Sequence, residues 1–219
     1  MEPIYTIIRF FQTGGTFMYP ILVVLALGIA IAIERYLKVT AARRESVKVW
    51  EEIRPMLEHG RFDEALAFTE GSDTPISKLI NLGLGRLGSV RRRDDIEIAM
   101  EEGMMEIIPL LEKRTPYLAL FANIATLLGL LGTIMGLIEA FTAVSAANPA
   151  EKADLLSASI SVAMNTTAFG LMVGIPLLLL HAVLSSKTSE IVDSLEMASV
   201  KVLNLIGEVG KREGAGSHA

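Results

Sequence analysis

The chain has 219 residues, of which 51% are hydrophobic and 21% are charged, and its mean hydropathy is +0.47. These values argue against an ordinary soluble domain and favour a membrane protein. Because the sequence contains no cysteine, disulfides and thiolate metal sites are excluded, whereas the net charge of −5 is uninformative as a total.

Three apolar stretches are long enough to cross a bilayer, which takes roughly 20 helical residues. A cleaved signal peptide is the competing interpretation of the N-terminus. The start of the chain is not strongly basic, however, and the first apolar stretch ends at Glu34 and Arg35 without a small-residue cleavage site. We therefore predict an external segment at 1–15 and transmembrane helices at 16–37, 116–145 and 155–185.

Basic residues near the ends of the spans predict the orientation of the chain, because cytoplasmic loops are enriched in lysine and arginine. They follow the first span, precede the second and follow the third: Arg35, Lys38, Arg43, Arg44, Lys48, Lys113, Arg114, Lys187 and Lys201. The short connection at 146–154 holds only Lys152, and Arg9 is the one base that opposes the pattern. We expect the N-terminus and the 146–154 loop outside, and residues 38–115 and the C-terminus inside.

The cytoplasmic region at 38–115 is predicted to be mostly helical. Breaks are expected at Pro55, His59–Gly60, Gly71–Pro75 and Gly88, with short helices at 61–70 and 74–87. A further helix is expected from Asp94 or Asp95 as the N-cap, with one apolar face made of Ile96, Met100, Met104, Ile107 and Leu111. If Pro109 and Pro116 only bend it, this helix and the second span form one helix of about 50 residues.

The third span is expected to continue into the cytoplasm as a helix at 186–209, because no helix breaker precedes Gly207. Its apolar residues recur at alternating four- and three-residue steps, namely Ile191, Leu195, Ala198, Val202, Leu205 and Val209. Such a seam usually packs against another helix. The small and polar tail at 210–219 is expected to be disordered. The predicted fold is thus an all-α membrane protein with three transmembrane helices and long cytoplasmic helical extensions of the second and third.

The second and third spans each carry a stripe of small residues that includes one threonine. The stripes consist of Ala122, Ala125, Gly129, Gly132, Gly136 and Ala140 with Thr133, and of Ser159, Ala163, Gly170 and Gly174 with Thr167. Thr133 and Thr167 each lie about 11 residues, or ~16 Å, from the outer end of their span. Both hydroxyls are therefore expected at one level near the membrane middle, on antiparallel neighbours.

Two interpretations of these stripes are open. They can be ordinary seams of helix packing, in which each threonine bonds a carbonyl one turn back. Alternatively, they border an ion path. No acid or base lies deep in the membrane, so a partner would have to bring the titratable group. A helix bearing an aspartate would need the close approach and the nearby hydroxyls that the stripes supply.

The chain resembles the MotA/TolQ/ExbB family of ion-driven inner-membrane motors, in its three-span TolQ/ExbB branch. The resemblance covers nearly the whole length. It consists of Glu34-Arg35 at the end of the first span, GRFDEAL in the cytoplasmic region, LLGTIMGLIEAF in the second span and TTAFGLMVGIP in the third. The four-span flagellar stators have an additional helix for which this sequence has no counterpart.

The resemblance implies a pentamer around a dimer of a single-span ExbD/TolR-like partner, whose intramembrane aspartate carries the proton. It also implies that the hydroxyls of Thr133 and Thr167 face that aspartate, and that proton flow steps the pentamer around the dimer. The small residues that would line the pore are Gly129, Gly132, Gly136, Ala163, Gly170 and Gly174. Nutrient uptake, envelope maintenance and gliding all stay open as the powered process.

One residue departs from the family pattern. Family members typically carry a glutamate five positions before the threonine that matches Thr167, and this chain has Val162 there. Asn165 and Thr166 add polar oxygens to the ion path, and since hard cations favour such ligands, sodium stays an alternative to the proton. Glu139, about 9 Å nearer the outside than Thr133, could collect cations at an outer vestibule, although a solvated carboxylate is the simpler interpretation.

The sequence gives no indication of enzymatic chemistry. It has no phosphate-binding Gly-rich Lys-Ser/Thr loop, no metal-ligand cluster with usable spacing and no nucleophile elbow, so we expect neither a cofactor nor a resident metal. Nucleic-acid binding has no support beyond the triplet Arg91–Arg93. The main alternative to a motor is a non-conducting membrane scaffold, and a permease subunit powered by a separate ATPase is a third.

Overall fold

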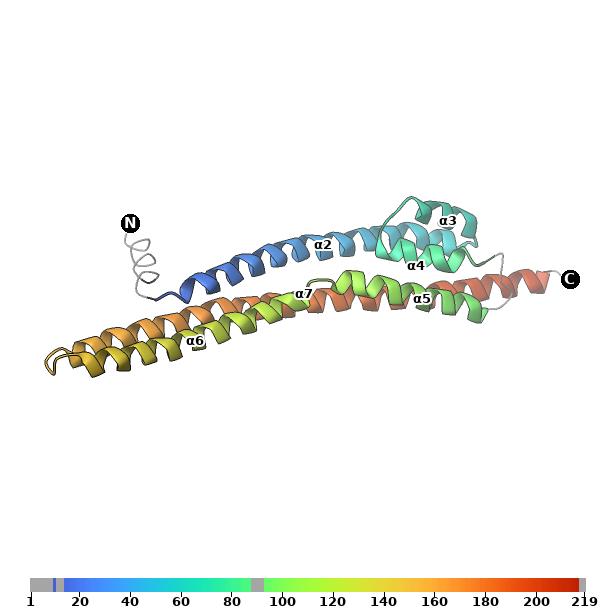
Figure 1. Cartoon of the computed structure of the whole chain (residues 1–219). Helices are drawn as coiled ribbons and strands as arrows, with labels where there is room; N and C mark the ends of the chain where they lie inside the picture. Colours follow the sequence, from blue (N-terminus) through green and yellow to red (C-terminus); the bar gives the residue numbers. More distant parts are fainter. Residues whose placement is uncertain (1–9, 11–13, 88–92, 217–219) are drawn as a thin grey trace, which may run out of the picture. The chain divides into compact units, whose positions relative to one another are not determined.

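The computed structural model describes residue 10 and residues 14–87 and 93–216, with the side chains of Arg93 and of 210–216 left out (Figure 1). Within these ranges the chain is helical and has no strand. The helices are α2 (Met18–Glu58), α3 (Phe62–Glu70), α4 (Pro75–Leu84), α5 (Arg93–Glu112), α6 (Pro116–Ala146) and α7 (Lys152–Gly216). The prediction of an all-α chain is confirmed. The predictions for Arg9 and Gly88 lie outside the described residues.

Three helical stretches are long and apolar enough to cross a membrane, as predicted. They are Met18–Glu58, the stretch Asp94–Ala146 that contains α6, and Lys152–Val209. The chain divides into two compact units. Unit 1 comprises Met1–Arg35 and Arg114–Val183, and unit 2 comprises Tyr36–Lys113 and Leu184–Ala219. Where the membrane surfaces lie along these helices stays a prediction.

In unit 1, small residues permit close helix packing and large apolar residues point outward. Gly28 on α2 lies against Leu177 on α7, where an added Cβ would come within 2.7 Å of the leucine side chain. By contrast, Val23, Leu127 and Leu179, one from each helix, expose more than half of their surface. Outward-facing side chains of this kind suit a lipid environment, since they gain nothing from contact with water.

Unit 2 has a hydrophobic core to which α2, α3, α4, α5 and α7 all contribute. The predicted face of α5 is buried in it, with Met100 fully inaccessible. The predicted seam of α7 is buried from Ile191 to Val202 and partly buried beyond. Both faces are confirmed, because each holds an apolar residue at every turn.

Unit 2 corrects several predicted helix boundaries. Pro55 lies inside α2 and does not end it, since Ile53 and Leu57 on either side are fully buried in the core. The helix ends at Glu58 instead, where Gly60 takes a left-handed conformation (φ 72°) that glycine adopts without strain. The next helices are shorter than predicted: α3 begins at Phe62, and α4 spans Pro75–Leu84.

The second span and the helix before it do not form one helix of about 50 residues, which was expected only if Pro109 and Pro116 merely bend that helix. The chain turns at 113–115 between α5 and α6, and Arg114 adopts a left-handed conformation with φ 67°. Pro116 explains the turn, because its ring would clash with the carbonyl of Glu112 in a continuous helix. Instead it occupies the first turn of α6, where proline is favoured.

The ends of the two remaining helices also differ from the prediction. Asp94 and Asp95 lie in the first turn of α5 and are not N-caps, since the helix begins at Arg93. Carboxylates are favourable there because they face the positive end of the helix dipole. The backbone of α7 is helical through Gly216, beyond the predicted end at 209.

Candidate functional site

The helices α6 and α7 approach each other closely where Gly129 meets Gly170. A Cβ added to Gly170 would lie 2.7 Å from the carbonyl oxygen of Ala125 and 3.0 Å from the Cα of Gly129. A Cβ added to Gly129 would lie 3.2 Å from the Cα of Gly170. The two helices therefore touch backbone to backbone in unit 1, as small residues at helical spacing allow.

The same approach brings Thr133 and Thr167 together. Their hydroxyls are hydrogen-bonded to each other across the two helices. Thr167 Oγ1 also lies 3.0 Å from the carbonyl oxygen of Gly129, and Thr133 Oγ1 lies 3.3 Å from the carbonyl oxygens of Gly129 and Ala163. Each hydroxyl carries one proton, so these contacts are alternatives for donation. The result is a compact group of four oxygens that surrounds two protons.

The other two residues of the predicted ion path are arranged differently. Thr166 is buried, and its hydroxyl donates to the carbonyl oxygen of Gly14, before α2, or to that of Val162 one turn back. It therefore bonds the segment before α2, and no bond joins it to Thr133 or Thr167 in the described residues. Asn165 is half-buried and engaged in a polar contact.

The predicted pore-lining glycines lie between helices of the same chain. Gly132 is buried against Thr166, and Gly136 faces Ala163, whose Cβ would lie 3.0 Å from an added Cβ. Gly174 is buried against the carbonyl of Ala122. The packing interpretation of the stripes thus holds within one chain. Whether these residues also border a pore in an assembly is not tested and stays a prediction. Glu139, which was expected at an outer vestibule, is exposed on α6.

Two features of unit 1 were not predicted from the sequence. The segment before α2 packs on α7, through the bond from Thr166 to Gly14 and an edge-on contact of the Phe10 and Phe169 rings at 6.2 Å. The second feature is an ion pair at the predicted inner end of the first span, where Arg114 Nη1 lies 2.7 Å from Glu34 Oε2. The glycine pair Gly14-Gly15 was the only local signal in the sequence for the packing of this segment on α7. No sequence pattern indicated that Glu34 and Arg114 form an ion pair.

No group of three or more histidine, cysteine, aspartate or glutamate side chains that could hold a metal ion occurs among the residues for which the structure gives positions. The polar atoms that the structure brings together between α6 and α7 are hydroxyl and carbonyl oxygens. Such oxygens can pass a proton along or ligate a hard cation.

Similar proteins point to one family. A biopolymer-transport ExbB homolog of Methanothermobacter thermautotrophicus is 29% identical over 195 residues, 88% of this chain and 67% of that protein. The Tol-Pal system protein TolQ of Haemophilus influenzae is 36% identical over 42% of this chain and 40% of its own length. An ExbB-like biopolymer-transport protein of Synechocystis is 25% identical over 80% of this chain and 83% of its own length. Residues 71–197, more than half of the chain, match the MotA/TolQ/ExbB proton channel family. The chain belongs to that family.

Proposed function

We propose that this protein is the ion-conducting subunit of an inner-membrane motor, which couples proton flow to mechanical work on the cell envelope. The observation that carries the proposal is the hydroxyl pair of Thr133 and Thr167, set among carbonyl oxygens at the contact of α6 and α7. Family membership supports it, because the family is one of proton channels.

The hydroxyl pair suits a partner that brings a carboxyl group. A hydroxyl can donate to a carboxylate and, after rotation, accept from the protonated acid. Thr133 and Thr167 could therefore hold the aspartate of a single-span ExbD/TolR-like protein in both of its protonation states. Each elementary charge that crosses 100 mV releases about 2.3 kcal/mol, so several charges would supply one mechanical step.

The proposed assembly is a homo-oligomer, a pentamer around a dimer of that partner, with the N-terminus outside and the C-terminus in the cytoplasm. Val162 supports a relay through hydroxyls, because it stands where the family typically has a glutamate and offers no side-chain proton. In this chain the backbone carbonyl of Val162 accepts a bond from Thr166. Sodium is the alternative ion, since Asn165 and Thr166 could add ligand oxygens.

Valine substitutions at the two threonines test the proposal. The full chain is purified with the ExbD/TolR-like protein and reconstituted in liposomes, and proton entry is followed with a pH-sensitive dye under an imposed potassium diffusion potential. We expect Thr133→Val and Thr167→Val to abolish most of the potential-driven flux, and Thr133→Ser and Thr167→Ser to retain it. Normal flux through correctly assembled valine variants would overturn the proposal.

A matched control is available on α6. Thr126 is exposed, and its hydroxyl bonds the carbonyl oxygen of Ala122 one turn back at 3.0 Å. Thr126→Val removes the same atom from the same helix, so we expect unchanged flux. Repeating the assay at fixed potential without sodium identifies the ion, because flux that persists cannot depend on sodium.

A membrane scaffold without conduction is the second candidate. The burial of Gly129 and Gly170 between α6 and α7 favours it, since that packing alone accounts for both glycines. The flux assay separates the two candidates, because a scaffold carries no potential-driven current in any variant.

A further inference from the structure

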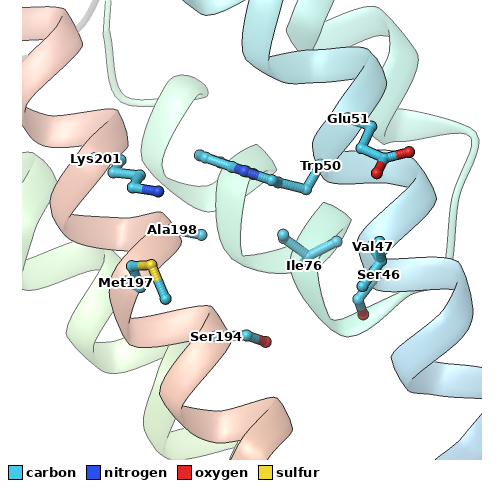
Figure 2. A pocket seen from close by; sticks show the side chains of 9 residues that line it. All are labelled: Ser46, Val47, Trp50, Glu51, Ile76, Ser194, Met197, Ala198 and Lys201. Atoms are coloured by element: carbon cyan, nitrogen blue, oxygen red, sulfur yellow. The ribbon is translucent and has the colours of Figure 1, made fainter.

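Unit 2 has a groove between α2 and α7. It consists of two adjoining hollows of about 200 and 180 Å³, which share Trp50 and Lys201. Figure 2 shows the larger hollow, where Trp50 extends from α2 toward α7 and Ile76 of α4 forms part of the wall. Lys201 Nζ lies 5.8 Å from the centre of the Trp50 ring. Most of the surface of the larger hollow is apolar, with a lysine where the two hollows meet.

The rim of this groove is apolar and accessible. Val47 on α2 and Met197 on α7 line the larger hollow and expose 51% and 54% of their surfaces, and Val200 beside them is also exposed. An apolar rim gathered around a hollow is typical of a surface that another molecule covers.

The outer face of α5 carries the opposite features. Ile98 and Met105 project from it with 53% and 74% of their surfaces exposed, and a spacing of seven residues places both on one stripe. Glu101 and Glu102 lie between them. From Asp94 to Glu112 the helix contains no lysine or arginine. This face is therefore an apolar ridge in a strongly acidic surface.

In the described part of the chain, no salt bridge involves the acids of the ridge. Among the described residues, no base lies within ion-pair distance of Glu97, Glu101, Glu102 or Glu106. In the groove, Arg54 is already paired with Glu58 at 2.8 Å, so Lys201 is the base left to meet an acid from outside. Glu51 also lines the larger hollow, which favours seating an incoming carboxylate at the Lys201 end.

We propose that the α5 ridge of one copy of this chain docks in the α2/α7 groove of a neighbouring copy. Met105 would fill a hollow, and Glu101 or Glu102 would pair with Lys201. An amphipathic helix that lays its apolar stripe in a groove is a common mode of recognition. We take the contact to be head-to-tail, each copy giving its ridge to the next, and such a contact leads to a ring if its rotation closes. The inference rests on the homo-oligomer of the proposed function and names the surfaces that would join it.

Cysteine cross-linking in membranes tests this contact, since the chain has no native cysteine. We expect the double variant Met105→Cys/Met197→Cys to give a ladder of covalent oligomers with a short bis-maleimide. Each single variant should stay monomeric, and the two single variants expressed together should give dimers only. Asp63→Cys/Met197→Cys is the matched control and should stay monomeric, because Asp63 is an exposed residue of α3 outside the ridge.

Two outcomes would overturn the inference. In the first, the single variant Met105→Cys cross-links to itself. In the second, the double variant forms an oligomer of wild-type mass but does not cross-link.

The fluorescence emission of Trp50, the single tryptophan, is a second measurement. Met105→Asp leaves the core of unit 2 intact, and we expect it to shift the Trp50 emission of the assembly to the red. An unchanged spectrum would contradict the docking. Neither measurement involves Thr133 or Thr167, so normal proton flux with failed cross-linking refutes the docking alone.

Discussion

Gly170→Ala tests how tightly the seam between α6 and α7 is packed. The added methyl group would lie 2.7 Å from the carbonyl oxygen of Ala125 and 3.0 Å from the Cα of Gly129. Both obstacles are backbone atoms, which cannot move aside as the end of a side chain can. Reaching an ordinary contact of about 3.4 Å requires the helices to part locally by about 0.7 Å, and such a shift breaks close packing along the seam.

The expected cost follows from two opposing terms. Overpacking of a tight site typically costs about 1–3 kcal/mol. Alanine in a helix is favoured over glycine by about 1 kcal/mol, which offsets part of that cost. Because both obstacles are backbone atoms, we place the overpacking cost at the upper end of its range and expect Gly170→Ala to lower the free energy of unfolding by about 2 kcal/mol.

The measurement is reversible unfolding of the purified protein in mixed micelles, followed by circular dichroism. Gly136→Ala is a graded comparison, because the nearest atom to its new methyl group is the Cβ of Ala163 at 3.0 Å and the nearest backbone atom, the Cα of Ala163, lies at an ordinary 3.4 Å. Gly71→Ala is the neutral control, since nothing lies within 4 Å of its added Cβ. If Gly170→Ala proves as stable as Gly71→Ala, the backbone contact of α6 and α7 is wrong.

Three further substitutions have expected outcomes. Thr166→Val removes the hydroxyl that bonds the carbonyl oxygen of Gly14, so we expect a loss of about 1 kcal/mol and faster amide exchange of the residues before α2, relative to Thr166→Ser. Arg114→Gly should be more stable than Arg114→Ala by about 1 kcal/mol in the same unfolding assay, because only glycine adopts a φ of 67° without strain; equal stabilities would contradict this reason. Thr74→Ala should cost about 1 kcal/mol in thermal unfolding and Thr74→Ser far less, since the Thr74 hydroxyl caps α4 by accepting a bond from the backbone of Ser77.

The sequence was sufficient to predict those parts of the fold that repeat with helical periodicity. The buried faces of α5 and α7 follow from an apolar residue at each turn, for example Met100 and Leu195. The pairing of Thr133 with Thr167 was also predictable, because two antiparallel spans of known direction fix the depth of each residue. These inferences needed only the rise per residue of a helix and the order of the spans.

Contacts that neither helical periodicity nor the depth of a span determines could not be predicted in this way. The ion pair of Glu34 with Arg114 depends on where two helices meet, and no local pattern encodes that meeting. The bond from Thr166 to Gly14 has the same origin. The break at Pro116 could not be predicted for another reason, because a proline can either bend a helix or end it. In this structure the helix ends in a turn at 113–115, with Arg114 in a left-handed conformation.

The glycine seam and the hydroxyl pair depend on the same geometry. Thr167 reaches the carbonyl oxygen of Gly129 at 3.0 Å, across the interface, only because α6 and α7 touch at Gly129 and Gly170. Parting the helices by a few tenths of an ångström would lengthen that bond beyond the usual hydrogen-bond distance. If the hydroxyl pair conducts protons, Gly170→Ala should therefore reduce the flux although it changes no polar atom. A scaffold function predicts only the loss of stability, so stability and flux measured on this one variant separate the two functions.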